Sequence, residues 1–200
     1  MDFAKNLKLI IFDFDGTLHD PGIDWESVKQ AIGIEGTSES LGDAINRFKI
    51  EKNHTALQTI TELELNAIKG QKINSSVIKV LKNLQEKYEL AVFSRNSRKM
   101  IERLFKRSGL SSIYLVGRED VERIKPHPSG LYKILAQFDR LPNHAVLVGD
   151  TFHDAVVAQL VGLTSVIVGE NYKPEAKTSK QPDYHMKSLE EFASMMGVGA

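Results

Sequence analysis

The stretch KLIIFDFDGTLHD, residues 8–20, decides the fold of this chain. Its apolar run over residues 9–12 is typical of a buried strand. The run ends in Asp13 and Asp15, and Gly16 follows them directly. Because desolvation penalises a charged carboxylate, two such groups at the end of an apolar strand need a compensating partner. The stretch therefore predicts a buried strand that delivers two acids to a polar site.

Short apolar runs of the same kind recur along the chain, and each is hydrophobic on both faces, as in buried parallel strands. The five predicted strands cover residues 7–12, 90–93, 113–116, 145–148 and 164–168. Amphipathic helical patterns alternate with the later strands, opened by Asn74 or Ser75, by Ser97 and by Pro128, and Ser188 opens a last helix. This alternation predicts an α/β fold with an open, Rossmann-like parallel sheet flanked by helices.

The segment between the first two strands is too long for a single crossover. It contains three helical patterns, the first opened by Asp24. We interpret residues 20–72 as a small inserted α-helical cap, and residues 1–19 and 73–200 as the α/β core. The alternative is that this segment forms a longer covering of the sheet edge. The polar, proline-interrupted residues 172–183 are predicted to form a loop.

Composition excludes several classes of function. Among the 200 residues, Lys+Arg and Asp+Glu both number 26, so the formal net charge is zero. This balance disfavours nucleic acid as a partner, because binding a polyanion requires a basic surface. The chain has no cysteine, and we find neither a signal-peptide pattern nor a membrane-spanning apolar run. We therefore expect a cytoplasmic protein without a membrane partner. The balanced charge does not exclude a small phosphorylated ligand held by one or two local cations, and the sequence does not predict the oligomeric state.

Polar residues with complementary chemistry follow the predicted strands. Asp13 and Asp15 follow the first strand, Ser94 the second and Asp150 the fourth, while Lys125 precedes a helix. In open parallel sheets, ligands bind beyond the carboxyl ends of the strands. These residues are therefore expected to meet at one edge of the sheet.

Carboxylates gathered at one point repel each other unless a cation neutralises them. Oxygen ligands without soft donors suit Mg²⁺, which also binds phosphate. Ser94 and Arg95 precede the helix opened by Ser97, whose free N–H groups are expected to favour an anion. Lys125 adds a positive charge, so the sequence predicts a site for Mg²⁺ and a phosphoryl group.

Four ordered motifs carry a family resemblance: DFDGT at 13–17, FSRN at 93–96, KPHP at 125–128 and GDTFHD at 149–154. Together they resemble the haloacid dehalogenase superfamily, in its phosphatase branch with a small helical cap (phosphoglycolate phosphatase-like). The resemblance covers almost the whole chain except the predicted cap. It implies a Mg²⁺-dependent phosphatase that hydrolyses a small phosphomonoester.

The resemblance also implies roles for individual residues. Asp13 would be the nucleophile that forms an aspartyl-phosphate, and Asp15 the general acid and base. Asp13, the main-chain carbonyl of Asp15, and Asp150 would hold Mg²⁺. Ser94 and Lys125 would bind the transferring phosphoryl group, with Gly16, Thr17 and Asp154 in supporting roles. From its position directly after Ser94, and not from the resemblance, Arg95 is also expected to bind phosphate.

Alternatives remain for the role of Arg95, for the function and for two histidines. The family often has Asn directly after the Ser or Thr of its second motif, whereas Arg95 intervenes here, either as a substrate contact or as a solvent-exposed side chain. The alternative functions are a phosphomutase of the same family, a phospho-acceptor regulator, and a catalytically silent binding protein. His19 and His153 flank the acidic motifs without an assigned role.

Overall fold

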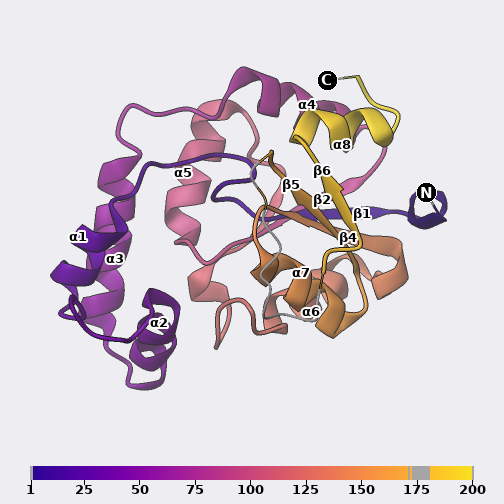
Figure 1. Cartoon of the computed structure of the whole chain (residues 1–200). Helices are drawn as coiled ribbons and strands as arrows, with labels where there is room; N and C mark the ends of the chain where they lie inside the picture. Colours follow the sequence, from indigo (N-terminus) through magenta and orange to yellow (C-terminus); the bar gives the residue numbers. More distant parts are fainter. Residues whose placement is uncertain (1, 171, 173–180, 200) are drawn as a thin grey trace.

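The computed structural model describes residues 2–170, 172 and 181–199, and it is built on one parallel sheet (Figure 1). The sheet has six strands in the order β3-β2-β1-β4-β5-β6, and every neighbouring pair is parallel. The strands are β1 (Leu9–Phe12), β2 (Glu89–Phe93), β3 (Tyr114–Val116), β4 (Ala145–Gly149), β5 (Thr164–Val168) and β6 (Tyr184–Met186). The predicted α/β class and the five predicted strands are confirmed.

Strand β6 was not predicted, because its three residues lack the apolar run of the other strands. It follows the segment predicted to be a loop, residues 172–183. Most of that segment, residues 173–180, lies outside the described residues.

Helices cover both faces of the sheet (Figure 1). One layer contains α4 (Ser75–Gln85), α5 (Arg98–Ser108) and α8 (Leu189–Met195), and the other contains α6 (Ser129–Phe138) and α7 (Phe152–Val161). The central strand supplies both cores, because side chains alternate along a strand. Ile10 and Phe12 pack toward the first layer, and Leu9 and Ile11 pack toward the second. Three short 3₁₀ helices complete this part: η1 (Asp2–Lys5), η2 (Arg118–Asp120) and η3 (Pro142–His144).

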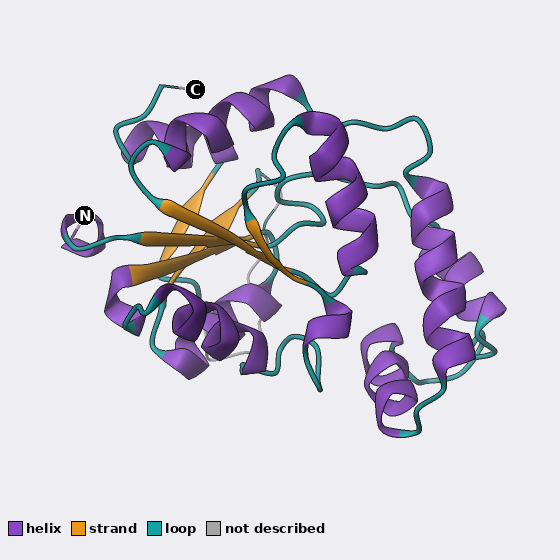
Figure 2. Ribbon diagram, turned by 180° about the vertical axis from the view of Figure 1, so that it is seen from behind, coloured by secondary structure: helices purple, strands orange, loops and turns teal. Residues whose placement is uncertain are grey.

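The three remaining helices lie between β1 and α4 in sequence and stand to one side of the sheet (Figure 2). They are α1 (Trp25–Ala31), α2 (Leu41–Ile50) and α3 (His54–Ala67). They share a small apolar cluster of Ile34, Ala44 and Phe48, and α3 also packs against α5. The two chain segments that join these helices to the sheet are held together, since His19 Nε2 donates to Gln71 Oε1 over 2.7 Å.

Side-chain caps explain where several helices begin. Asp24 accepts hydrogen bonds from the backbone of Glu26 and Ser27 at α1, and Asn74 accepts one from Ser76 at α4, as their sequence positions predict. Helix α5 ends at Gly109, whose φ of 71° is accessible to glycine at low cost. Within the described part of the chain, none of these helices combines the length and apolar character that crossing a bilayer requires.

Candidate active site

Strand register brings the predicted site residues together. Phe12 of β1 is level with Val92 of β2 and with Val148 of β4, so the residues that follow these strands reach the same edge of the sheet. A pocket of about 660 Å³ opens there, a size suited to a small molecule. The predicted residues that line it are Asp13, Asp15, Gly16, Ser94, Arg95, Lys125 and Asp150. The other two, Thr17 and Asp154, are buried beside it.

Lys125 lies at the centre of the acidic cluster. Its Nζ atom is 2.6 Å from Asp13 Oδ1 and 2.8 Å from Asp154 Oδ1, and the residue is only 3% exposed. Burial by itself lowers the pKa of Lys125, but the two carboxylates outweigh it and raise the pKa above its usual value. Lys125 therefore remains charged and neutralises part of the cluster.

Asp13 and Asp154 respond differently to the shared lysine. Burial raises the pKa of Asp13 above its ordinary value, although Lys125 opposes this. Burial also acts on Asp154, yet Lys125 and Thr151 overcome it and lower its pKa. Thr151 donates to Asp154 Oδ2 from both its hydroxyl and its backbone N–H, over 2.9 and 3.2 Å. Asp154 thus caps α7 and holds Lys125 at the same time.

Asp150 and Gly16 are in close contact. A Cβ atom on Gly16 would lie 2.1 Å from Asp150 Oδ2, and the φ of Gly16 is +80°, so a side chain has neither the space nor a relaxed backbone there. Asp150 Oδ1 is buried and has no hydrogen-bond partner among the described residues. Burial, followed by the charges of Asp13 and Asp154, raises the pKa of Asp150 to about 7.

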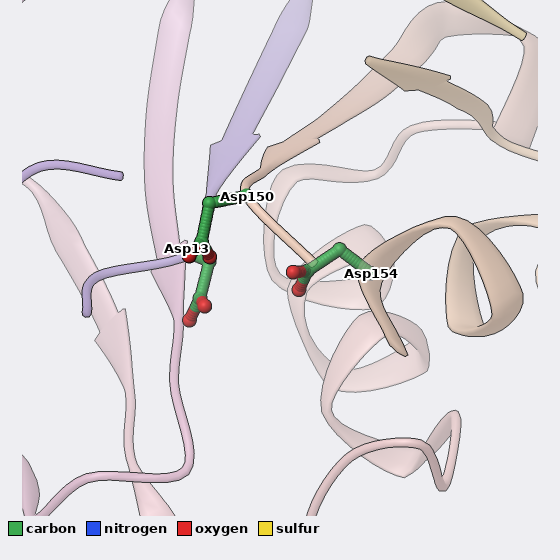
Figure 3. A group of neighbouring side chains, drawn as sticks. All are labelled: Asp13, Asp150 and Asp154. Carbon is green, nitrogen blue, oxygen red and sulfur yellow. The ribbon is translucent and has the colours of Figure 1, made fainter. Parts of the chain in front are cut away.

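These acids match the ligand preference of Mg²⁺. Oxygen atoms of Asp13, Asp150 and Asp154 lie within 4.8 Å of one another, and Figure 3 shows the Asp154 carboxylate facing the other two. Both oxygens of Asp154 are already engaged by Lys125 and Thr151. The unpartnered oxygen of Asp150 makes it, with Asp13, the better pair of ligands for a hard cation.

Asp15 and Thr17 lie in a tight turn after β1. The backbone N–H groups of Leu18 and His19 both donate to the carbonyl of Phe14, and Gly16 N–H donates to the carbonyl of His19. The turn places half-buried Asp15 in the pocket. Burial, then the charges of Asp13 and Asp20, raise the pKa of Asp15 to about 7, against the effect of Arg95. Thr17 is buried, and its hydroxyl has no partner among the described residues.

Ser94 and Arg95 reach the pocket from the end of β2. Ser94 is 2% exposed, and its Oγ atom accepts a hydrogen bond from Asn96 N–H over 3.1 Å, which leaves the hydroxyl proton available for a ligand. Arg95 is exposed on the pocket wall. Its charge acts on Asp15, as the lowering effect on the Asp15 pKa indicates.

Two N–H groups of the expected anion site at the start of α5 already have partners. Ser97 N–H donates to Glu64 Oε2 over 3.1 Å, and Arg98 N–H donates to Glu119 Oε2 over 2.8 Å. The prediction that N–H groups at the start of this helix bind phosphate was therefore wrong for these two groups, because carboxylates of the chain itself occupy them.

Glu64 and Arg118 also line the pocket, although the sequence predicts no role for either; Arg118 is noticeable only as a charged residue that follows the third predicted strand. One pattern could have revealed Glu64: it lies at helical i, i+4 spacing between Ile60 and Ile68, which are both fully buried. An acid within an apolar stripe predicts a buried charge with a partner. Of the two histidines that flank the acidic motifs, His153 lines the pocket and His19 does not.

Comparison with known proteins agrees with this fold. A family model described as haloacid dehalogenase-like hydrolase matches residues 22–168, which include the second, third and fourth motifs. The chain belongs to the haloacid dehalogenase-like hydrolase family. Pyrophosphatase PpaX from Bacillus anthracis is 33% identical over 107 residues, 48% of this chain and 50% of PpaX. The chain thus spans about half the length of the curated relatives it matches.

Solved structures are similar over nearly the whole chain. A predicted phosphoglycolate phosphatase from Haemophilus somnus has a TM-score of 0.66 at 19% identity, covering 95% of this chain and 98% of that one. YfnB from Bacillus subtilis is assigned to the haloacid dehalogenase (HAD) hydrolases and was solved with magnesium bound. It has a TM-score of 0.65 at 16% identity, covering 96% of this chain and 99% of that one. At these identities the likeness shows the shared fold.

Proposed function

We propose that this chain is a Mg²⁺-dependent phosphatase that hydrolyses a small phosphomonoester through an aspartyl-phosphate on Asp13. The observation that carries the proposal is the position of Lys125, whose Nζ atom contacts both Asp13 and Asp154 in a pocket that Ser94 and Asp150 also line. A nucleophilic carboxylate beside a buried cation is the arrangement that an anionic substrate requires.

The proposed reaction has two steps. A carboxylate oxygen of Asp13 attacks phosphorus while the ester P–O bond breaks, and Asp15 donates its proton to the departing oxygen. Asp15 then removes a proton from water, which attacks the aspartyl-phosphate, releases inorganic phosphate and restores both acids. Asp15 suits this role because it lies in the pocket two residues after the nucleophile.

Asp13, the main-chain carbonyl of Asp15 and Asp150 would hold the Mg²⁺ ion. The unpartnered Asp150 oxygen supports this assignment, as does the side-chain-free surface that Gly16 leaves beside it. When bound, Mg²⁺ supplies positive charge that neutralises the carboxylates and the phosphoryl oxygens. The magnesium seen in YfnB is consistent with this choice of ion.

Ser94 and Lys125 would bind the phosphoryl oxygens, and Arg95 would contact the anionic substrate from the pocket wall. Thr17 and Asp154 would support the site, Asp154 by holding Lys125. The cation of Lys125 and the free hydroxyl proton of Ser94 provide a charge and a hydrogen-bond donor for a phosphate group.

We further propose that residues 20–72 form a cap and that residues 1–19 and 73–200 form the core. Helices α1–α3 have their own apolar cluster, and two linkers join them to the sheet. Residues of these helices also line the pocket, among them Trp25, Leu41 and Asn46. The cap would therefore contact the leaving group and exclude water during the reaction.

Phosphate release in the presence and absence of metal tests the function. The panel should contain phosphoglycolate, sugar phosphates, an aryl phosphate and inorganic pyrophosphate, the last because of the PpaX relatives. We expect Mg²⁺-dependent release from at least one of these compounds, loss of most activity with EDTA, and recovery when excess Mg²⁺ is added. Release that chelation does not change would contradict the metal assignment.

A further inference from the structure

A second buried ion pair, between Glu64 and Arg118, has no role in the proposed chemistry. Glu64 is fully buried and Arg118 is 2% exposed. Arg118 donates from its two terminal nitrogens to the two Glu64 oxygens over 2.9 and 2.8 Å, and it also donates to Thr61 Oγ1 over 2.9 Å. This geometry fixes the relative orientation of both side chains.

The two residues come from different parts of the fold. Glu64 lies on α3, among the helices beside the sheet, and Arg118 begins η2, one residue after the end of β3. Helix α3 also packs against α5, which starts after the second motif. The ion pair therefore joins the proposed cap to the proposed core at the edge of the pocket.

The pair also holds the backbone of the residues that follow Ser94. Arg118 reaches the Arg95 carbonyl from its side chain over 3.4 Å and the Asn96 carbonyl from its backbone N–H over 3.0 Å. Glu64 accepts from Ser97 N–H over 3.1 Å. The side chains of the pair thus hold the backbone of residues 95 and 97, and the backbone N–H of Arg118 holds Asn96 between them.

This backbone controls the Ser94 hydroxyl. Asn96 N–H donates to Ser94 Oγ over 3.1 Å, so a shift of residues 95–97 also moves the hydroxyl that faces the pocket. The Ser97 side chain makes no capping hydrogen bond to α5, and the carboxylate of Glu64, which comes from α3, accepts the N–H of Ser97 at the start of this helix.

Stability alone does not explain a charged pair at this position. Removing two charges from water is costly, and apolar residues of similar volume are often as stable or more stable. What the pair provides is a fixed arrangement of directional hydrogen bonds. We propose that Glu64 and Arg118 are positioning residues that align the Ser94 loop with Asp13 and Lys125 when α3 packs on α5. This inference rests on the proposed phosphatase function.

The test separates alignment from stability. We would compare the double variant Glu64→Leu/Arg118→Met, which removes both charges, with each single variant. Each single change leaves one charge buried without a partner and is expected to lower the melting temperature, whereas the double variant recovers it. The kcat of the double variant on an aryl phosphate is nevertheless expected to stay about 10- to 100-fold below wild type, because small displacements of catalytic groups have effects of that size. The change in KM is expected to be smaller.

Arg118→Lys provides a second test with the charge retained. A lysine cannot bind both Glu64 oxygens and the Arg95 carbonyl at once, so we expect a folded protein that again has a reduced kcat. A matched control is Glu39→Leu/Arg47→Met, since Arg47 binds Glu39 through two 2.9 Å hydrogen bonds on the same group of helices but outside the pocket. This control is expected to keep the wild-type kcat.

Wild-type kcat in the folded double variant, or in Arg118→Lys, would overturn the inference. A wild-type protein that releases no phosphate from any compound on the panel would instead refute the proposed function. The two failures are therefore distinct.

Discussion

Asp13→Asn is expected to lower the rate of phosphate release from an aryl phosphate by about 10⁴-fold or more, as removal of a catalytic nucleophile does in other enzymes. The amide has the shape of the carboxylate but is a very poor nucleophile. Its oxygen still accepts a hydrogen bond from Lys125, whose Nζ atom lies 2.6 Å from Asp13 Oδ1 in the wild type. The fold should therefore be retained, which circular dichroism and thermal melting would verify.

Asp139→Asn is the matched control for this change. Asp139 ends α6 in a left-handed conformation, with φ of 51°, which Asn adopts as readily as Asp. It does not line the pocket, so activity and stability should both equal those of the wild type. Near wild-type turnover by Asp13→Asn would remove Asp13 from the mechanism.

Lys125→Met is expected to impair both stability and turnover. Asp13 and Asp154 would lose the buried cation that lies 2.6 and 2.8 Å from them. Removing one partner from a buried charge cluster lowers the free energy of unfolding by about 3 kcal/mol. Asp13 would also take up a proton more readily and lose nucleophilicity, so we expect a fall in kcat of about 10³-fold. Urea unfolding and phosphate release measure the two effects.

Lys133→Met serves as the control, because Lys133 is a largely exposed lysine whose Nζ atom lies 3.9 Å from Asp120 Oδ1. Its loss should change the free energy of unfolding by less than about 0.5 kcal/mol. If Lys125→Met were as stable and as active as this control, Lys125 would have no part in holding the acidic cluster or in turnover, and the account of the site would be contradicted.

The strands of the central sheet could be predicted because burial on both faces leaves continuous apolar runs, as in β1 and β4. Strand β6 lies at the edge of the sheet, where His185 is exposed and the apolar run is absent. Its pairing with β5 is a long-range interaction, for which the local sequence contains no pattern.

The polar residues at the strand ends could be predicted to meet because parallel register aligns these ends. The pocket lining includes Asp13, Ser94, Lys125 and Asp150, as expected. The partners of the α5 N–H groups could not be predicted in the same way. They are Glu64 and Glu119, which are distant in sequence from Ser97, and only the packing of α3 on α5 brings Glu64 there.

The central claim is that Asp13 accepts the phosphoryl group, and Asp15→Asn allows the most direct measurement of it. With p-nitrophenyl phosphate the leaving group departs without a proton, so phosphorylation should proceed, whereas hydrolysis lacks its general base and should stall. Mass spectrometry of this variant with Mg²⁺ is expected to find one added phosphoryl group per chain, on the peptide that contains Asp13. A phosphoryl group on any other residue, or wild-type turnover by Asp15→Asn with no modified protein, would contradict the account.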